Sequence, residues 1–110
     1  MSETAHFVHH VIDLMSDAEE IRVRKMFGGY GIFIREAMIG LVSENILYLK
    51  ADNQSSKKFE ERGLRPFTYF RKGRKVKLSY YQAPEETLED REAMQKWMHL
   101  AYEAALRSAR

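Results

Sequence analysis

The 110-residue chain contains no cysteine and only two prolines. The absence of cysteine excludes disulfides, thiolate metal ligands and cysteine nucleophiles together. Long hydrophobic runs are also missing, since no apolar stretch approaches the ~20 residues that cross a bilayer. The first ten residues, MSETAHFVHH, lack the basic-then-apolar order of a signal peptide. We therefore expect a cytoplasmic protein that has no membrane segment.

The residues that are present fit one globular domain. Hydrophobic residues make up 45% of the chain, which is enough for a single core, so we expect one domain over residues 1–110. The net charge of +2 is small, but the charge is unevenly distributed. From Lys57 to Lys77 there are nine Lys and Arg against two Glu, whereas residues 1–56 carry five basic and eight acidic residues. Cationic density is therefore confined to the middle third of the chain.

The first half of the chain changes from helical to strand periodicity. Apolar residues at helical spacing predict a helix over residues 4–17, capped by Ser2 or Thr4. Alternating apolar segments then predict four strands, at residues 21–27, 30–36, 38–44 and 45–51, with reversals at Glu36–Ala37 and Glu44–Asn45. Connections this short leave no room for parallel crossovers and indicate an antiparallel meander.

Two further helices are predicted in the second half. A short helix at residues 54–62 is ended by Gly63, and a long amphipathic helix at residues 88–109 closes the chain. The residues suited to begin them are Asp52 or Asn53 for the first and Thr87 or Asp90 for the second.

A hairpin is predicted between these helices. Residues 65–70 and 76–81 alternate as strands, and residues 71–74 form the turn, in which Gly73 adopts a positive φ. Pro84 ends the second strand. The order helix, four strands, helix, two strands, helix predicts a two-layer α+β domain with one antiparallel sheet.

The stretch RKMFGGYGIF, residues 24–33, raises the question of a phosphate-binding loop. A dinucleotide fingerprint needs its glycines between a strand and a helix, but here a strand follows them. No Lys-Ser or Lys-Thr pair follows either, so a P-loop also fails. We interpret Gly28–Gly29 as a turn between two strands, and Gly31 and Gly40 as positions that make room for neighbouring aromatic rings.

Candidates for catalysis or metal binding are weak. His6 and His10 lie one helical turn apart, but no third ligand follows at a matching position and the H-E-x-x-H pattern is absent. We interpret them as surface histidines. The serines lack the context of a nucleophile elbow. We therefore predict no catalytic residues, no metal site and no cofactor.

The hairpin RPFTYFRKGRKVKLSYY, residues 65–81, is the surface with functional promise. Its cations suit phosphate neutralisation and its exposed rings suit base stacking, although an alternating strand buries about half of the rings. We favour the hypothesis that the hairpin docks a protein partner, and direct nucleic-acid binding is the alternative. A third interpretation is that the basic tip only protects a sheet edge from pairing. The predicted binding residues are Tyr69, Arg71, Lys72, Arg74, Lys75 and Lys77.

These segments together resemble a known family. The core MFGGYG at Met26–Gly31, followed by GLVSENILYLKAD, PFTY and YYQAPEE, is similar to the TfoX amino-terminal domain family, named for a bacterial regulator of natural competence. The resemblance implies a two-layer α+β fold and a non-enzymatic regulatory or adaptor role in transcriptional control of DNA uptake, through protein partners. Full-length competence regulators have a second, carboxy-terminal domain. This sequence ends at Arg110, directly after the predicted closing helix, so we expect a single-domain member of the family. Exposed strand edges favour a homodimer.

Overall fold

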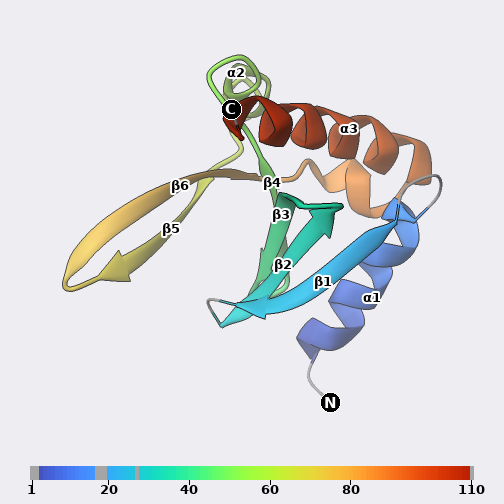
Figure 1. Cartoon of the computed structure of the whole chain (residues 1–110), viewed down its shortest axis with the longest axis horizontal. Helices are drawn as coiled ribbons and strands as arrows, with labels where there is room; N and C mark the ends of the chain where they lie inside the picture. Colours follow the sequence, from blue (N-terminus) through green and yellow to red (C-terminus); the bar gives the residue numbers. More distant parts are fainter. Residues whose placement is uncertain (1–2, 17–19, 27, 110) are drawn as a thin grey trace.

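The computed structural model describes residues 3–16, 20–26 and 28–109. These residues form three α-helices, six strands and one 3₁₀ turn (Figure 1). In chain order they are α1 (Glu3–Met15), β1 (Ile21–Met26), β2 (Gly29–Ile34), β3 (Ala37–Ser43), β4 (Ile46–Lys50), α2 (Ser56–Glu60), β5 (Pro66–Arg71), β6 (Arg74–Gln82), η1 (Glu85–Leu88) and α3 (Arg91–Ser108). The predicted α+β class and element order are confirmed.

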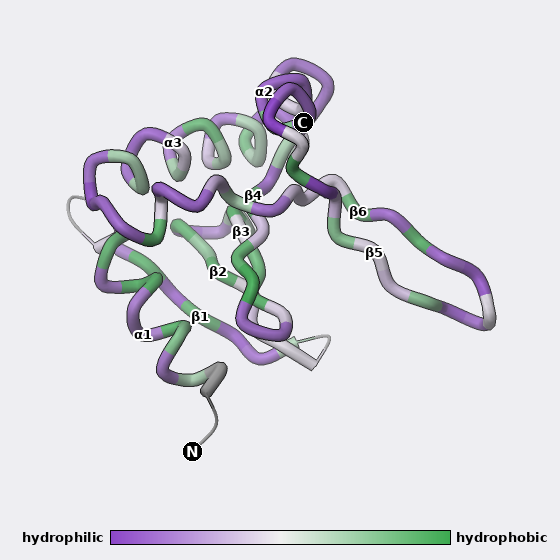
Figure 2. Tube along the Cα trace, turned by 180° about the vertical axis from the view of Figure 1, so that it is seen from behind, coloured by the Kyte–Doolittle hydropathy of each residue, from purple (hydrophilic) through white to green (hydrophobic). Residues whose placement is uncertain are grey.

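The six strands make one antiparallel sheet in the order β1-β2-β3-β4-β6-β5. The first four strands follow each other as a meander, as predicted. After β4 the chain forms α2 and then the strands β5 and β6. It is β6 that pairs with β4, so β5 is an edge strand. The β5–β6 hairpin projects away from the rest of the fold in both views (Figures 1 and 2).

One hydrophobic cluster joins the helices to one face of the sheet. Helical side chains of α1, α2 and α3 meet alternate residues of β2, β3 and β4 in this cluster. A bulge in the β2–β3 pairing places the extra residue Ile39 in the same cluster. Its fully buried members include Val11, Met15, Ile32, Ile39, Leu49, Phe59 and Met94.

Several predicted boundaries shift by a few residues. α1 begins at Glu3, so Thr4 lies inside the helix, while Ser2, Asp17 and Phe27 lie outside the described residues. The β2–β3 reversal falls at Arg35–Glu36, because Ala37 is already the first residue of β3. The turn at Glu44–Asn45 is confirmed, with φ of 51° and 63°.

The short helix α2 is entered through a turn that Asp52 stabilises. The Asp52 carboxylate accepts hydrogen bonds from the backbone N–H groups of Gln54 and Ser55, both at 3.1 Å. The helix itself begins after Ser55, so neither Asp52 nor Asn53 is its N-cap. Gly63 ends this segment as predicted, with φ of 72°, and the next N–H group bonds back to the Phe59 carbonyl at 3.1 Å.

A 3₁₀ turn that the sequence did not indicate precedes the last helix. Pro84 ends β6 as predicted and precedes η1, where the buried Thr87 hydroxyl donates to the Pro84 carbonyl at 2.6 Å. α3 therefore begins at Arg91, not at residue 88. Asp90 is its N-cap, as one of the two predicted candidates, and accepts from the Ala93 N–H at 3.0 Å.

The glycine stretch forms a strand turn with close packing. Gly28 adopts φ of 75°, and Gly29 opens β2, so a strand and not a helix follows. A Cβ at Gly29 would collide with the carbonyl oxygen of Val42. Gly31 is crowded by two methionines as well as by Phe33. Gly40 is crowded by a backbone carbonyl and aliphatic side chains, so the prediction of aromatic neighbours is wrong for that position.

Candidate binding surfaces

The predicted site lies on the β5–β6 hairpin, which we call the arm. Its two strands are joined by Lys72 and Gly73, with φ of 53° and 78°. Two residues with positive φ match the right-handed twist of a hairpin, so the ladder continues to the tip. β6 starts at Arg74, two residues earlier than predicted, which makes the arm longer and its turn tighter.

The arm brings the predicted cations together, and the register places Tyr69 on the same face of the hairpin as Arg71 and Arg74. The cationic side chains are all exposed, and the register places Arg71 opposite Arg74. Tyr69 is half-buried, lies opposite Val76 and stacks on Phe67 with ring centroids 6.1 Å apart. The exposed cations of the arm are Arg71, Lys72, Arg74, Lys75 and Lys77.

Phe70 is a surface residue that the sequence reasoning did not select. Its side chain is 74% exposed, and it lies opposite Lys75 near the tip. In contrast, Phe67 and Tyr81 are buried, so the expectation that about half of the arm's rings are buried holds. The alternation along β5 could have identified Phe70, because a residue between Tyr69 and Arg71 must point to the face opposite theirs.

A second surface is the sheet face opposite the helix-packed cluster. Paired residues in an antiparallel sheet share a face, and the register links Arg24, Gly31, Leu41, Tyr48 and Gln82 in one row across five strands. Sequence reasoning missed this row because it requires the pairing of five strands. We call this surface the open face; its side chains include those of Arg22, Arg24, Phe33, Met38, Tyr48, Lys50, Phe67, Tyr69 and Tyr80.

The rings of the open face contact one another and its cations. Tyr48 and Phe67 meet edge to face with centroids 5.0 Å apart. The guanidinium carbons of Arg22 and Arg24 lie 5.8 and 5.9 Å from the centroid of Phe33. These distances are within the range of cation–π attraction, so the arginine side chains are held against the ring.

Charge is segregated between strands and helices. The strands, as the structure describes them, contain eight Lys and Arg and no Asp or Glu. Ion pairs among the described residues do not involve these strand cations; Arg62 pairs with Glu86, for example, and Arg107 with Asp52. The sheet is therefore a cationic layer, whereas the helices carry seven Asp and Glu against five Lys and Arg.

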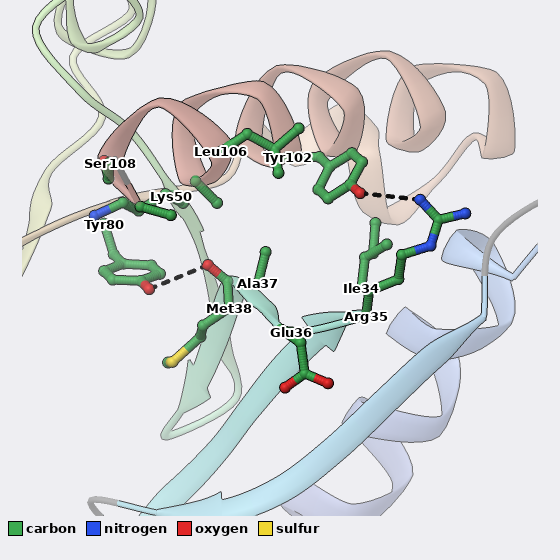
Figure 3. A pocket seen from close by; sticks show the side chains of 12 residues that line it. Ile34, Arg35, Glu36, Ala37, Met38, Lys50, Tyr80, Tyr102, Leu106 and Ser108 are labelled. Carbon is green, nitrogen blue, oxygen red and sulfur yellow. Dashed lines mark hydrogen bonds between the residues drawn. The ribbon is translucent and has the colours of Figure 1, made fainter.

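A cleft of about 430 Å³ opens between the C-terminal half of α3 and the β2–β3 turn (Figure 3). Ile34, Ala37 and Leu106 give it apolar walls. Arg35 donates to the Tyr102 hydroxyl at 3.3 Å, on the side of the cleft away from Tyr80. The cleft shares Met38, Lys50 and Tyr80 with the open face, so the two surfaces are continuous.

The polar groups of the cleft are suited to binding. The Tyr80 hydroxyl donates to the Met38 carbonyl at 3.3 Å. Burial raises the pKa of Tyr80 to about 12, so the phenol stays protonated at neutral pH. No nucleophile is paired with a base among the residues lining this cleft, whereas apolar walls with a few polar groups suit ligand contact.

The histidines of α1 are placed at the surface, and His10 has a structural contact. Its Nε2 donates to the Leu88 carbonyl at 2.7 Å, which ties α1 to η1. His6 and His9 are exposed. Within the described ranges, no group of three or more His, Cys, Asp or Glu residues is arranged to hold a metal ion. In the same ranges, no helix is long and apolar enough to span a bilayer.

Known proteins share this sequence pattern. The TfoX N-terminal domain profile matches residues 13–105. Two relatives are "DNA transformation protein TfoX1" of Aliivibrio fischeri, 28% identical over 76% of this chain and 40% of its own length, and "Protein Sxy" of Escherichia coli, 29% identical over 79% of this chain and 42% of its own. The chain thus spans about two fifths of each relative. With its α+β fold and glycine turn, this chain belongs to the TfoX N-terminal domain family.

Proposed function

We propose that this domain is a non-enzymatic regulatory or adaptor module in the control of DNA uptake, and that its arm binds an acidic surface of a protein partner. One relative is named a DNA transformation protein, which supports the process. The observation that carries the proposal is the arm itself, which projects from the fold (Figure 1). It carries five exposed cations and the exposed ring of Phe70.

The chemistry of the arm fits a protein partner. An exposed aromatic side chain is a common anchor in protein interfaces, and Phe70 supplies one beside Lys75. Surrounding cations speed the encounter with an acidic surface and select against basic partners. The ladder of β5 and β6 holds these groups in fixed register, which lowers the entropy lost on binding.

A pull-down from cells tests this proposal with matched charge changes. The bait carries Arg71→Ala, Arg74→Ala and Lys75→Ala, and the control bait carries Lys57→Ala, Lys58→Ala and Lys96→Ala, which remove three exposed cations from α2 and α3. We expect partners held by the arm to fall at least ~10-fold with the arm variant, as for loss of a binding hot spot. The control should retain them. Equal recovery with both baits discards the arm as the docking surface.

Duplex DNA is the second candidate for the arm, because a two-stranded β-ribbon fits the major groove. The same arm variant distinguishes the two candidates in a fluorescence-anisotropy titration with a labelled duplex. Phosphate contacts make affinity fall steeply with salt. Absence of binding at low salt removes the duplex candidate and leaves the protein partner.

A further inference from the structure

We propose that the open face binds single-stranded DNA, with bases stacked on Phe33 and Tyr48 and phosphates held by Arg22, Arg24 and Lys50. This site is separate from the tip of the arm and does not rest on the partner proposed for it. Three observations carry the inference: a run of rings on one sheet face, cations beside those rings, and the absence of carboxylates from the described strands, so that the carboxylate acting on Tyr48 is that of Glu44 in the β3–β4 turn.

The rings form a surface that stacking requires. Tyr48, Phe67 and Tyr69 follow each other with centroid separations of 5.0 and 6.1 Å. Tyr48 and Tyr69 are half-buried, so their bodies are fixed by the sheet while part of each ring faces outward. Phe33 lies further along the same face, on β2. Rings fixed in this way stack unpaired bases without sequence preference.

The cations are placed where phosphates would run. Arg22 and Arg24 are on edge strand β1 and flank Phe33, and the Arg22 guanidinium is steadied by a 2.7 Å hydrogen bond to the Arg35 carbonyl. Lys50 lies on β4 with its Nζ 5.1 Å from the Tyr80 ring centroid. Since no described ion pair joins these cations to a carboxylate, their charge is available to an anionic strand.

The same observations separate single strands from other polyanions. In a duplex the base faces are stacked inside the helix, so rings set into a sheet surface cannot reach them. RNA differs by its 2′-hydroxyl, which a selective site recognises with hydrogen-bonding groups. The open face offers mainly rings and cations, and the Tyr80 hydroxyl is already bonded to the Met38 carbonyl. We therefore assign the surface to DNA.

A fluorescence-anisotropy titration with labelled dT15 at several salt concentrations tests the site. Tyr48→Leu and Phe33→Leu each remove a ring, and Tyr48→Phe keeps the ring as the matched control. We expect each ring loss to weaken binding by ~10-fold, because one base–aromatic stack is lost. The salt dependence should not change, and Tyr48→Phe should bind like the parent protein. Thermal melts establish that each variant is folded.

The cations have a distinct signature. Each phosphate contact to a single strand contributes about 0.7 to the slope of log affinity against log salt. Arg22→Gln with Arg24→Gln should therefore reduce that slope by about 1.4. The matched pair Lys75→Gln with Lys77→Gln removes two exposed charges from the opposite face of the arm and should leave the slope within about 0.5 of the parent value. A purely structural role for the β1 arginines would not change the slope.

Several results would overturn the proposal. These are the absence of dT15 binding at low salt, equal or tighter binding of a duplex, and an affinity for U15 that exceeds that for dT15. A larger effect of the arm pair than of the β1 pair moves the site to the arm. Because arm and open-face variants are separate, failure here leaves the partner proposal standing, and failure of the pull-down leaves this one standing.

Discussion

The two faces of the sheet differ in what they contact, although the same strands build both. On β4, Leu49 is fully buried in the helix-packed cluster, while its neighbour Tyr48 is half-buried on the open face against Phe67. On β2, Ile32 and Phe33 are divided in the same way. One face thus stabilises the fold by aliphatic burial, and the other presents aromatic and cationic groups. Because successive side chains of a strand point to opposite faces, the residues that stabilise the fold and those that we propose for binding lie on different faces of the same strands.

The largest effect that tests this comparison is expected from a pair of substitutions at adjacent positions of β4. Leu49→Ala should lower the free energy of unfolding by about 2–5 kcal/mol, since it leaves a cavity in the cluster. Tyr48→Ala removes a larger side chain, yet we expect only about 1 kcal/mol because the residue is half-buried. Urea denaturation measures both. Equal losses would show that the open face contributes to the core.

A smaller effect separates two glycines on opposite faces. The Cβ of Gly40→Ala would lie 2.8 Å from the backbone carbonyl oxygen of Tyr48, so we expect a loss of about 1–3 kcal/mol. In Gly31→Ala the Cβ meets the sulfur of Met26, which is the end of a flexible side chain. That variant should stay within about 1 kcal/mol of the parent protein. Thermal denaturation that ranks them in the reverse order would contradict this explanation.

The Arg107 side chain of α3 pairs with the Asp52 carboxylate, whereas no described ion pair involves a strand cation. We therefore expect the stability contribution of Arg107, but not that of the strand cations, to depend on pH. Hydrogen bonds from the Arg107 guanidinium are the main cause that lowers the pKa of Asp52 to about 2. A carboxylate with a lowered pKa stabilises the folded state above about pH 4, and this contribution disappears as pH falls toward 2. Arg107→Gln should therefore cost about 1–2 kcal/mol at pH 7 and progressively less below pH 4.

The control for this pH effect is Arg74→Gln on the arm, where the exposed side chain has no described ion-pair partner. Its free energy of unfolding should match that of the parent within about 0.5 kcal/mol at both pH values. Denaturation curves at pH 7 and pH 3 give the comparison. A gap for Arg107→Gln that stays constant with pH would mean that the pair acts through packing and not through charge.

Much of the fold could be predicted because its signals are local. Gly28 and Asn45 mark turns by their tolerance of positive φ, and strand alternation located each strand within about two residues. The 3₁₀ turn was missed because its stability depends on the Thr87 hydroxyl and the Pro84 carbonyl in a buried setting. That setting exists only after the helices have packed.

The open face could not be predicted from one strand at a time. Both residue sets along β2 are apolar or aromatic, and on β4 Lys50 alone departs from that pattern, so alternation does not say which set the helices cover. The row from Arg24 to Gln82 requires the pairing of five strands. One signal was available in the sequence, namely that the predicted strand interiors hold cations and almost no carboxylates. The arm, in contrast, is a local hairpin and was found directly.

The positive side chains at both borders of the sheet also affect how two copies meet. β1 ends the sheet on one side with Arg22, Arg24 and Lys25, and β5 ends it on the other with Arg71 beside the basic turn. Copies that approach with like borders bring these charges together, which opposes edge pairing and therefore argues against the strand edges as the route to the predicted homodimer. The same arrangement that attracts an anionic ligand thus keeps neighbouring sheets apart, and a bound polyanion that neutralises the borders would weaken that repulsion.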